Sequence, residues 1–250
     1  MRTSINGIEV PHEKNTKELI AMLNCDMPLF TVVCDALSCK IDTLSFETLL
    51  SILKDNDPYK RRVAIECLGN HVMFFRAIDD IIMCLDDKSH YVVRAAIEAM
   101  KKHRVLKSHE KIIKLLKSKD ESTRESAVSA LEYISTESDF DLVLNLLNDR
   151  NKRIRNTLPN VILVKANKAN WSKAYAVMKD SNNSKVRLAA CKLLNTFGSK
   201  TEKDEAKLFF QDKDGHVRKF SKKMIDGVNT VRIRKTSASH IQEDGTCARR

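Results

Sequence analysis

The chain has 250 residues, of which 42% are apolar, and a formal net charge of +11. That apolar share is enough for a buried core, which excludes a wholly disordered chain. With only six glycines and four prolines, the composition disfavours sheets with many tight turns and favours long helices. No apolar run reaches the ~20 residues of a membrane span, and the first residues lack the apolar core of a signal peptide. We therefore expect a soluble, cytoplasmic protein.

Seven apolar runs with helical spacing follow one another along the chain, at 19–23, 49–53, 81–85, 112–116, 142–147, 174–178 and 206–210. After each run comes a residue type that caps helix N-termini: Asp26, Asp57, Ser89, Asp120, Asn151, Asn183 and Asp214. A large apolar residue recurs eleven residues after each of these, at Leu37, Leu68, Met100, Leu131, Ile162, Leu194 and Ile225. The pattern predicts seven repeats, each with a first helix, a cap and a second helix.

These repeats define the expected domain organisation. Residues 1–13 form an N-terminal extension, 14–228 the repeat region with caps at 26, 57, 89, 120, 151, 183 and 214, and 229–250 a basic, flexible tail. The fifth repeat is irregular because Pro159 falls inside its second helix, where it removes a backbone hydrogen bond. Leu158 also stands where most other repeats carry a small residue. We expect the superhelix to change curvature near residues 155–162.

The second helices share a short motif, as in Thr123-Arg124…Ala127…Leu131 and Val186-Arg187…Ala190…Leu194. This motif resembles HEAT repeats, particularly the short HEAT-like type also found in phycobilisome lyases. The resemblance covers about residues 14–228 and implies an all-α, right-handed α-solenoid of about seven two-helix repeats whose second helices line the concave face. It indicates the fold more strongly than the function, because this fold carries many functions.

An arginine recurs at one position of the motif, at Arg61, Arg124, Arg155, Arg187 and Arg218. One interpretation makes this row a ladder for phosphate groups. The resemblance implies another, in which each arginine pairs with the capping Asp or Asn of a neighbouring repeat. We favour the second, structural interpretation.

Positive charge is concentrated in the last 100 residues, which carry 23 Lys or Arg and 9 Asp or Glu, whereas residues 1–50 carry 4 and 7. A basic inner groove attracts an acidic partner. The candidate binding residues are Lys152, Arg153, Arg155, Lys185, Arg187, Arg218, Lys219, Lys222 and Lys223. His90 and Tyr91, at the start of the third repeat's second helix, form a further candidate exposed pair.

Three functions are compatible with these residues. The first, which we favour, is a non-enzymatic scaffold that binds a protein with an acidic surface. The second is a nucleic-acid-binding protein, similar in fold to the HEAT-like alkylpurine DNA glycosylases. Those enzymes use an Asp framed by tryptophans, whereas this chain has only Trp171, with no acidic residue next to it in the sequence. The third is a phycobilin lyase or chaperone-like subunit with a bilin or phycobiliprotein as partner.

The sequence offers no catalytic centre for any of these functions. It contains no glycine-rich phosphate loop, nucleophile elbow or HExxH motif. Its seven cysteines are irregularly spaced without a CxxC pair, which argues against a zinc site or a disulfide framework. We therefore expect no catalytic residue, metal or cofactor, and if the protein is an enzyme, a lyase or glycosylase.

Overall fold

The computed structural model describes residues 4–5 and 7–225 and consists of two compact units. Unit 1 comprises residues 1–158 and unit 2 residues 159–250. The division falls inside one helix, α10 (Lys152–Lys165), between Leu158 and Pro159. No helix in the described part combines the length and the apolar character needed to cross a bilayer.

Unit 1 begins with a short antiparallel hairpin of β1 (Ser4–Ile5) and β2 (Ile8–Glu9), in which Ile5 pairs with Ile8. Gly7 forms the turn with a φ of 78°, a conformation that glycine adopts without steric cost. Both strands pack against the second helix of the first repeat. The sequence did not predict this hairpin, because two-residue strands leave no periodicity to detect.

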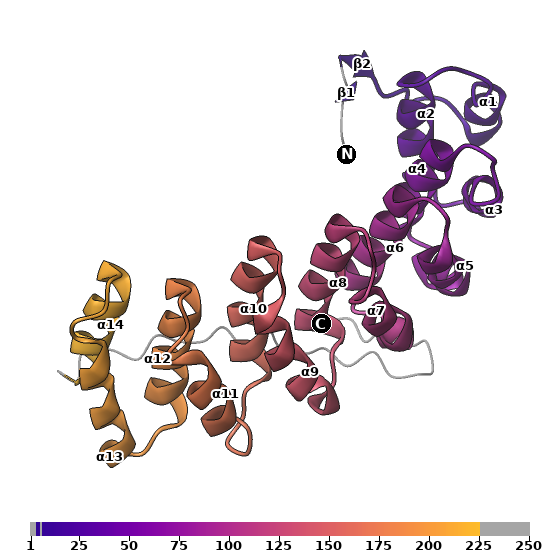
Figure 1. The fold of residues 1–250 in the computed structure, drawn as a ribbon. Helices are drawn as coiled ribbons and strands as arrows, with labels where there is room; N and C mark the ends of the chain where they lie inside the picture. The colour runs from indigo at the N-terminus through magenta and orange to yellow at the C-terminus, as the bar shows by residue number, and fades with distance from the viewer. Residues whose placement is uncertain (1–3, 6, 226–250) are drawn as a thin grey trace. The chain divides into compact units, whose positions relative to one another are not determined.

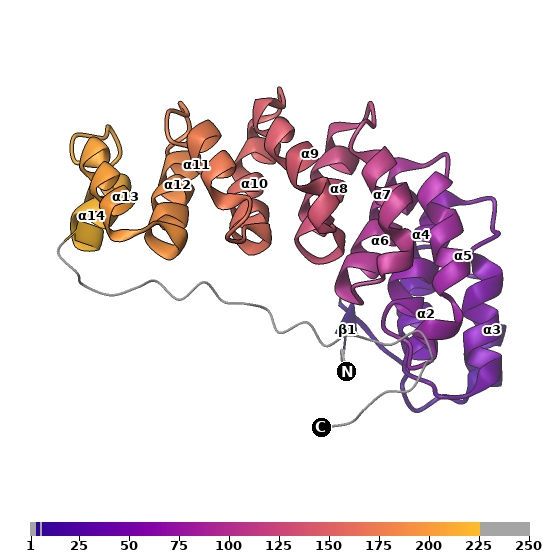
Figure 2. The ribbon, with the colours of Figure 1, turned by 90° about the horizontal axis from the view of Figure 1, so that it is seen from below.

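The rest of unit 1 is a series of helical pairs that follow one another in two rows (Figures 1 and 2). Successive second helices α2, α4, α6 and α8 pack side by side, and the first helices α1, α3, α5 and α7 each pack on their partners. The pairs are α1 (Thr16–Ala21) with α2 (Leu29–Ser38), α3 (Thr43–Ile52) with α4 (Pro58–Leu68), α5 (Ile78–Met83) with α6 (His90–Lys102), α7 (His109–Leu115) with α8 (Glu121–Ile134), and α9 (Phe140–Asn145) with α10. Short 3₁₀ turns join or extend them: η1 (Phe74–Arg76), η2 (Cys84–Asp86), η3 (Leu106–Ser108), η4 (Glu137–Asp139) and η5 (Leu146–Asn148).

Unit 2 by itself contains two further helical pairs. They are α11 (Trp171–Met178) with α12 (Ser184–Phe197), and α13 (Lys200–Lys203) extended by η6 (Asp204–Phe209) with α14 (Gly215–Ile225). In this unit α11 packs on α12, and α12 packs on α14. The first helix of the last pair is mostly 3₁₀, in keeping with its weak apolar run. The described residues thus contain the seven helical pairs that the repeat predicts.

Side-chain caps begin most of the second helices. Asp57 accepts a hydrogen bond from the Tyr59 backbone N–H at 2.8 Å, and Asp120 accepts one from Thr123 N–H at 2.7 Å. The same type of bond occurs at Asn151, Asn183 and Asp214. Such caps satisfy N–H groups that lack partners within the helix.

Two of the seven predicted caps differ. The expectation for Asp26 is wrong, because α2 begins at Leu29 and its N-cap residue is Pro28, which has no side-chain acceptor. Ser89 does occupy the N-cap position of α6, but its side chain makes no capping bond. Its backbone N–H instead donates to the carboxylate of Asp87 at 2.8 Å.

The recurrent apolar position lies in the core of each unit. Its side chain is fully buried at Leu37, Leu68, Met100, Leu131 and Ile162, and 1% exposed at Leu194. Burying one such side chain stabilises the fold by roughly 1.5–3 kcal/mol. Ile225 is only partly buried, because α14 is the last helix in the described part of the chain. Stacking of repeats therefore buries faces that a single helical pair would leave in water.

Helix α10 runs without interruption through Pro159, and both Leu158 and Pro159 are buried. The boundary between the two units nevertheless falls at this bond. The change of curvature near residues 155–162 stays a prediction. The predicted tail, 229–250, lies outside the described residues.

Candidate functional site

The recurring arginines, which we call the loop arginines, are held by the loop that precedes their own helix. Each donates from Nη1 to the backbone carbonyl six residues earlier. The distance is 2.8 Å from Arg61 to Asp55, 2.8 Å from Arg124 to Ser118, and 2.7 Å from Arg187 to Ser181. Arg155 and Arg218 bond in the same way to the carbonyls of Asp149 and Asp212.

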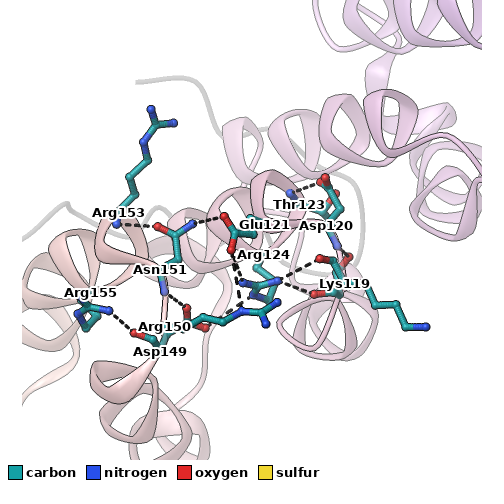
Figure 3. Close-up of polar contacts among 11 residues, drawn as sticks. Lys119, Asp120, Glu121, Thr123, Arg124, Asp149, Arg150, Asn151, Arg153 and Arg155 are labelled. Carbon is teal, nitrogen blue, oxygen red and sulfur yellow. Dashed lines mark hydrogen bonds and ion pairs between the residues drawn. The ribbon is translucent and has the colours of Figure 1, made fainter.

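Some loop arginines also bind a carboxylate of the next repeat. Arg61 donates to both oxygens of Asp87 at 2.8 Å, and Arg187 donates to both oxygens of Asp212 at 2.6 and 2.7 Å. Arg124 is 3.7 Å from Asp149 and lies between that residue and Glu121 (Figure 3). Paired, charge-assisted bonds of this type are among the stronger hydrogen bonds in proteins.

The same carboxylates hold the start of the next helix. Asp87, Asp149 and Asp212 each stand two residues before a second helix's N-cap residue and accept the backbone N–H of that residue at 2.7–2.8 Å. Hydrogen bonds from Arg187 lower the pKa of Asp212. Burial opposes ionisation of Asp87, but the bonds from Arg61 and from the Ser89 backbone outweigh it, and the pKa is lowered.

The structural interpretation of these arginines therefore holds, with one correction. The neighbouring partner is the Asp two residues before the cap, not the capping Asp or Asn itself. The capping side chain is already engaged with the N–H groups of its own helix. Among the predicted binding residues are Arg155, Arg187 and Arg218. Their guanidinium groups donate hydrogen bonds to loop carbonyls, so their main contacts are within the repeats.

The predicted lysines of unit 2 stand on two helices that are in contact. Lys185 on α12 and Lys219, Lys222 and Lys223 on α14 are all exposed, and α12 packs directly against α14. Neither helix contains an Asp or Glu residue. We call these four residues the lysine face. Exposed ammonium groups without carboxylates on the same helices produce a positive potential that attracts anionic groups.

Lys152 and Arg153 belong to unit 1 and are not part of the lysine face. Lys152 is exposed at the start of α10. The side chain of Arg153 is 80% exposed and lies 3.8 Å from Glu125 on α8, an ion pair that water screens. The predicted basic residues are thus divided between two units.

His90 and Tyr91 begin α6 in unit 1, and both are exposed. Their ring centroids are 4.2 Å apart. The Tyr91 ring also stacks on that of Tyr59 from α4, with centroids 6.0 Å apart and planes inclined by 23°. The guanidinium groups of Arg62 and Arg94 lie over the rings of Tyr59 and Tyr91, at 5.8 and 5.2 Å.

The sequence prediction did not include Tyr59, Arg62 or Arg94 in this site. A signal was present, since both tyrosines stand two residues after their N-cap residue and both arginines five residues after it. Position in the repeat could therefore have identified the set, but only the packing of α4 against α6 shows that the rings meet.

Two hollows occur beside these surfaces. The larger, about 540 Å³, lies between loops of unit 2; of its charged groups, Arg187 binds Asp212, and Asp214 caps α14. The smaller, about 330 Å³, lies in unit 1 and is lined by Arg94, Glu98, Ser122, Glu125, Ser126, Ser129 and Arg153.

The described residues contain no group of three or more His, Cys, Asp or Glu side chains that could hold a metal ion. Burial raises the pKa of the Cys34 and Cys191 thiols to about 12 and that of Cys84 to about 11. Thiolates are the nucleophilic form of cysteine, so these three residues are unreactive at neutral pH. His109 binds Asp139 at 2.7 Å, which fixes η4 to the start of α7.

Stacked helical pairs with a repeated loop bond define an α-helical repeat protein. Residues 46–112 match the family model for HEAT repeats. No curated protein matches the sequence. This match covers 67 of the 250 residues, and the fold of the described residues is that of an α-helical repeat protein.

Solved structures show the same fold at low sequence identity. An archaeal HEAT-like repeats protein from Thermococcus onnurineus NA1 has a TM-score of 0.56 and 14% identity, covering 85% of this chain and 96% of its own. The complex of CpcE and CpcF of phycocyanin lyase from Nostoc sp. PCC7120 has a TM-score of 0.54 and 17% identity, and the match covers 90% of this chain and 97% of that one. A designed armadillo repeat protein has a TM-score of 0.52 and 14% identity, and the match covers 73% of this chain and 99% of that one. These likenesses establish the fold alone.

Proposed function

We propose that the protein is a non-catalytic docking scaffold that binds an acidic protein segment through the lysine face. The observation that carries this proposal is the absence of Asp and Glu from α12 and α14, two adjacent helices that expose Lys185, Lys219, Lys222 and Lys223. The loop arginines are bonded within the repeats, so the exposed ammonium groups are the cations available to a partner.

A protein partner fits the second helices better than a nucleic acid does. In unit 1 the corresponding helices carry Glu66, Glu98 and Glu125, all of them at least partly exposed. These carboxylates repel a continuous phosphate backbone, whereas a protein can present acidic groups to the lysine face alone. Base stacking is also disfavoured on α12 and α14, where the aromatic residues are Phe197 and Phe220 and both are half-buried.

The test is a fluorescence-anisotropy titration of the full chain with a labelled peptide of ten glutamates and with a labelled DNA duplex, at about 50 and 200 mM salt. The variant replaces Lys219→Glu and Lys222→Glu together. The matched control replaces Lys168→Glu and Lys200→Glu, two exposed lysines outside α12 and α14. We expect the acidic peptide to bind the unmodified chain and the control equally, and the variant at least tenfold more weakly.

The competing outcomes are distinct. Tight duplex binding that falls about a hundredfold between the two salt concentrations, and that the variant loses, would replace this proposal with a nucleic-acid function. Equal affinity of the variant and the control for the acidic peptide would show that the lysine face is not the binding surface.

A further inference from the structure

A second exposed surface, on α4 and α6 of unit 1, has a composition unlike the lysine face. It consists of Tyr59, Arg62, Tyr91 and Arg94, which we call the tyrosine–arginine patch. The two tyrosines are 52% and 43% exposed. Tyrosine and arginine are, with tryptophan, the residues most enriched among those that dominate protein binding energies.

The arginines of the patch have unused hydrogen-bonding capacity. The Nε atoms of Arg62 and Arg94 are buried and have no hydrogen-bond partner among the described residues. Arg62 has one partly exposed ion pair, at 3.3 Å from Glu66. Arg94 makes no hydrogen bond or ion pair with any residue in the described part of the chain, and it faces the 330 Å³ hollow. The buried Nε atoms cannot reach a ligand, so a carboxylate would bind the Nη atoms of guanidinium groups that the tyrosine rings hold in place.

The spacing of the patch restricts the shape of a ligand. Each tyrosine–arginine unit occupies the same register on adjacent packed helices, and helix axes in contact lie roughly 8–10 Å apart. A polyproline II chain has three residues per turn and rises about 3.1 Å per residue, so side chains at i and i+3 share a face and lie roughly 9 Å apart. Aromatic surfaces are the usual docking sites for this conformation.

We infer that the tyrosine–arginine patch binds an acidic peptide in a polyproline II conformation, with carboxylates at i and i+3 on Arg62 and Arg94 and with prolines against Tyr59 and Tyr91. Single-stranded nucleic acid fits less well, because a base inserted between the stacked rings must separate them.

The probe is a labelled peptide of four Glu-Pro-Pro units, titrated into the full chain. Two matched peptides serve as controls: one with Gln in place of Glu, and one with Glu-Pro-Pro-Pro units, which places successive carboxylates on different faces. All titrations use a Lys185→Gln, Lys219→Gln, Lys222→Gln, Lys223→Gln background, which removes the charges of the lysine face, so that failure of one site is distinguishable from failure of the other.

Arg62→Gln with Arg94→Gln is the test variant, and Lys114→Gln with Lys117→Gln is the control. The control removes the same charge from exposed positions at the end of α7 and just beyond it in unit 1. We expect the Glu-Pro-Pro peptide to bind at least about tenfold more tightly than either matched peptide. The test variant should lose at least about tenfold in affinity for it, while the control variant should not.

Three outcomes would overturn the inference. They are no binding of the Glu-Pro-Pro peptide by the background protein, equal binding of the Gln peptide, and equal losses in the test and control variants. Tighter binding of a labelled oligothymidylate that the test variant abolishes would assign the patch to single-stranded nucleic acid instead. Urea unfolding of both variants checks that the helices are intact.

Discussion

Replacing Arg187 with methionine should destabilise unit 2 by about 3 kcal/mol. Methionine keeps an unbranched apolar stem but loses two bonds to Asp212 and one to the Ser181 carbonyl. The side chains of Arg187 and Asp212 are 14% and 6% exposed, so water cannot readily replace the guanidinium. Removing one partner of such a buried pair costs about 3–5 kcal/mol. Asp212 keeps its hydrogen bond from the Asp214 backbone N–H, so we expect a cost at the lower end of this range.

The single tryptophan of the chain makes this effect measurable in unit 2. Trp171 is 8% exposed and begins α11, so its fluorescence reports on unfolding of this unit. With a urea m-value of about 2 kcal/mol/M, a loss of about 3 kcal/mol lowers the midpoint by about 1.5 M. Lys185→Met is the matched control, since it removes an exposed cation from the same helix. A midpoint for Arg187→Met within about 0.3 M of the control would refute the structural role of this arginine.

The pH dependence of the difference provides a second check. The bonds from Arg187 lower the pKa of Asp212 below its ordinary 3.8. The stability that this shift contributes is therefore present above the unfolded-state pKa and is lost as the pH falls through the lower folded-state value. The stability difference between wild type and Arg187→Met should be constant above about pH 5 and shrink below about pH 4. A difference that grows in acid would contradict the pairing.

Three further predictions concern unit 1, each measured by urea unfolding followed by far-UV circular dichroism. Burial lowers the pKa of His71, whose ring nitrogen accepts the Met73 backbone N–H at 3.0 Å. The free energy of unfolding should therefore fall as the pH drops below about 6.5, the pKa in the unfolded state. A His71→Gln variant that retains the full pH dependence would show that another group causes it. Leu131→Ala should cost about 2–5 kcal/mol because the side chain is fully buried, and a loss below about 1 kcal/mol would mean that this helix is not packed as described. Asp120→Ala should cost about 1 kcal/mol through its cap, whereas Ser89→Ala should cost much less, and equal losses would show that the two caps do not differ.

Much of the fold follows from local signals in the sequence. The N-cap residues Asp57, Asp120, Asn151, Asn183 and Asp214 stabilise backbone groups two or three positions away, so their effect does not depend on distant parts of the chain. Helical periodicity likewise places the core residue of each repeat on a face that must be buried. Asp26 is the exception, since the polar residue is present but Pro28 moves the start of α2.

The candidate sites depended more on tertiary structure. Composition and repeat register predicted a basic half, but charge alone does not separate Lys219, an exposed lysine, from Arg218, whose guanidinium is bonded to loop carbonyls. That distinction arises because the loop folds back to bring its carbonyl groups within reach of the arginine. Likewise, the sequence places Tyr59 and Tyr91 in one register, but their rings meet only because α4 packs on α6.

The sequence by itself therefore determined the number of repeats, the helical pairing within each repeat and most helix starts, because these depend on hydrogen bonds and apolar faces a few residues apart. Tertiary structure decided which carboxylate Arg61 and Arg187 bind, which cations reach the surface, and where the chain divides near Pro159. The arginine–carboxylate pairs join residues 25 or more positions apart, as Arg187 and Asp212 show. Sequence spacing identifies such residues as candidates, and only the packed backbone selects among them.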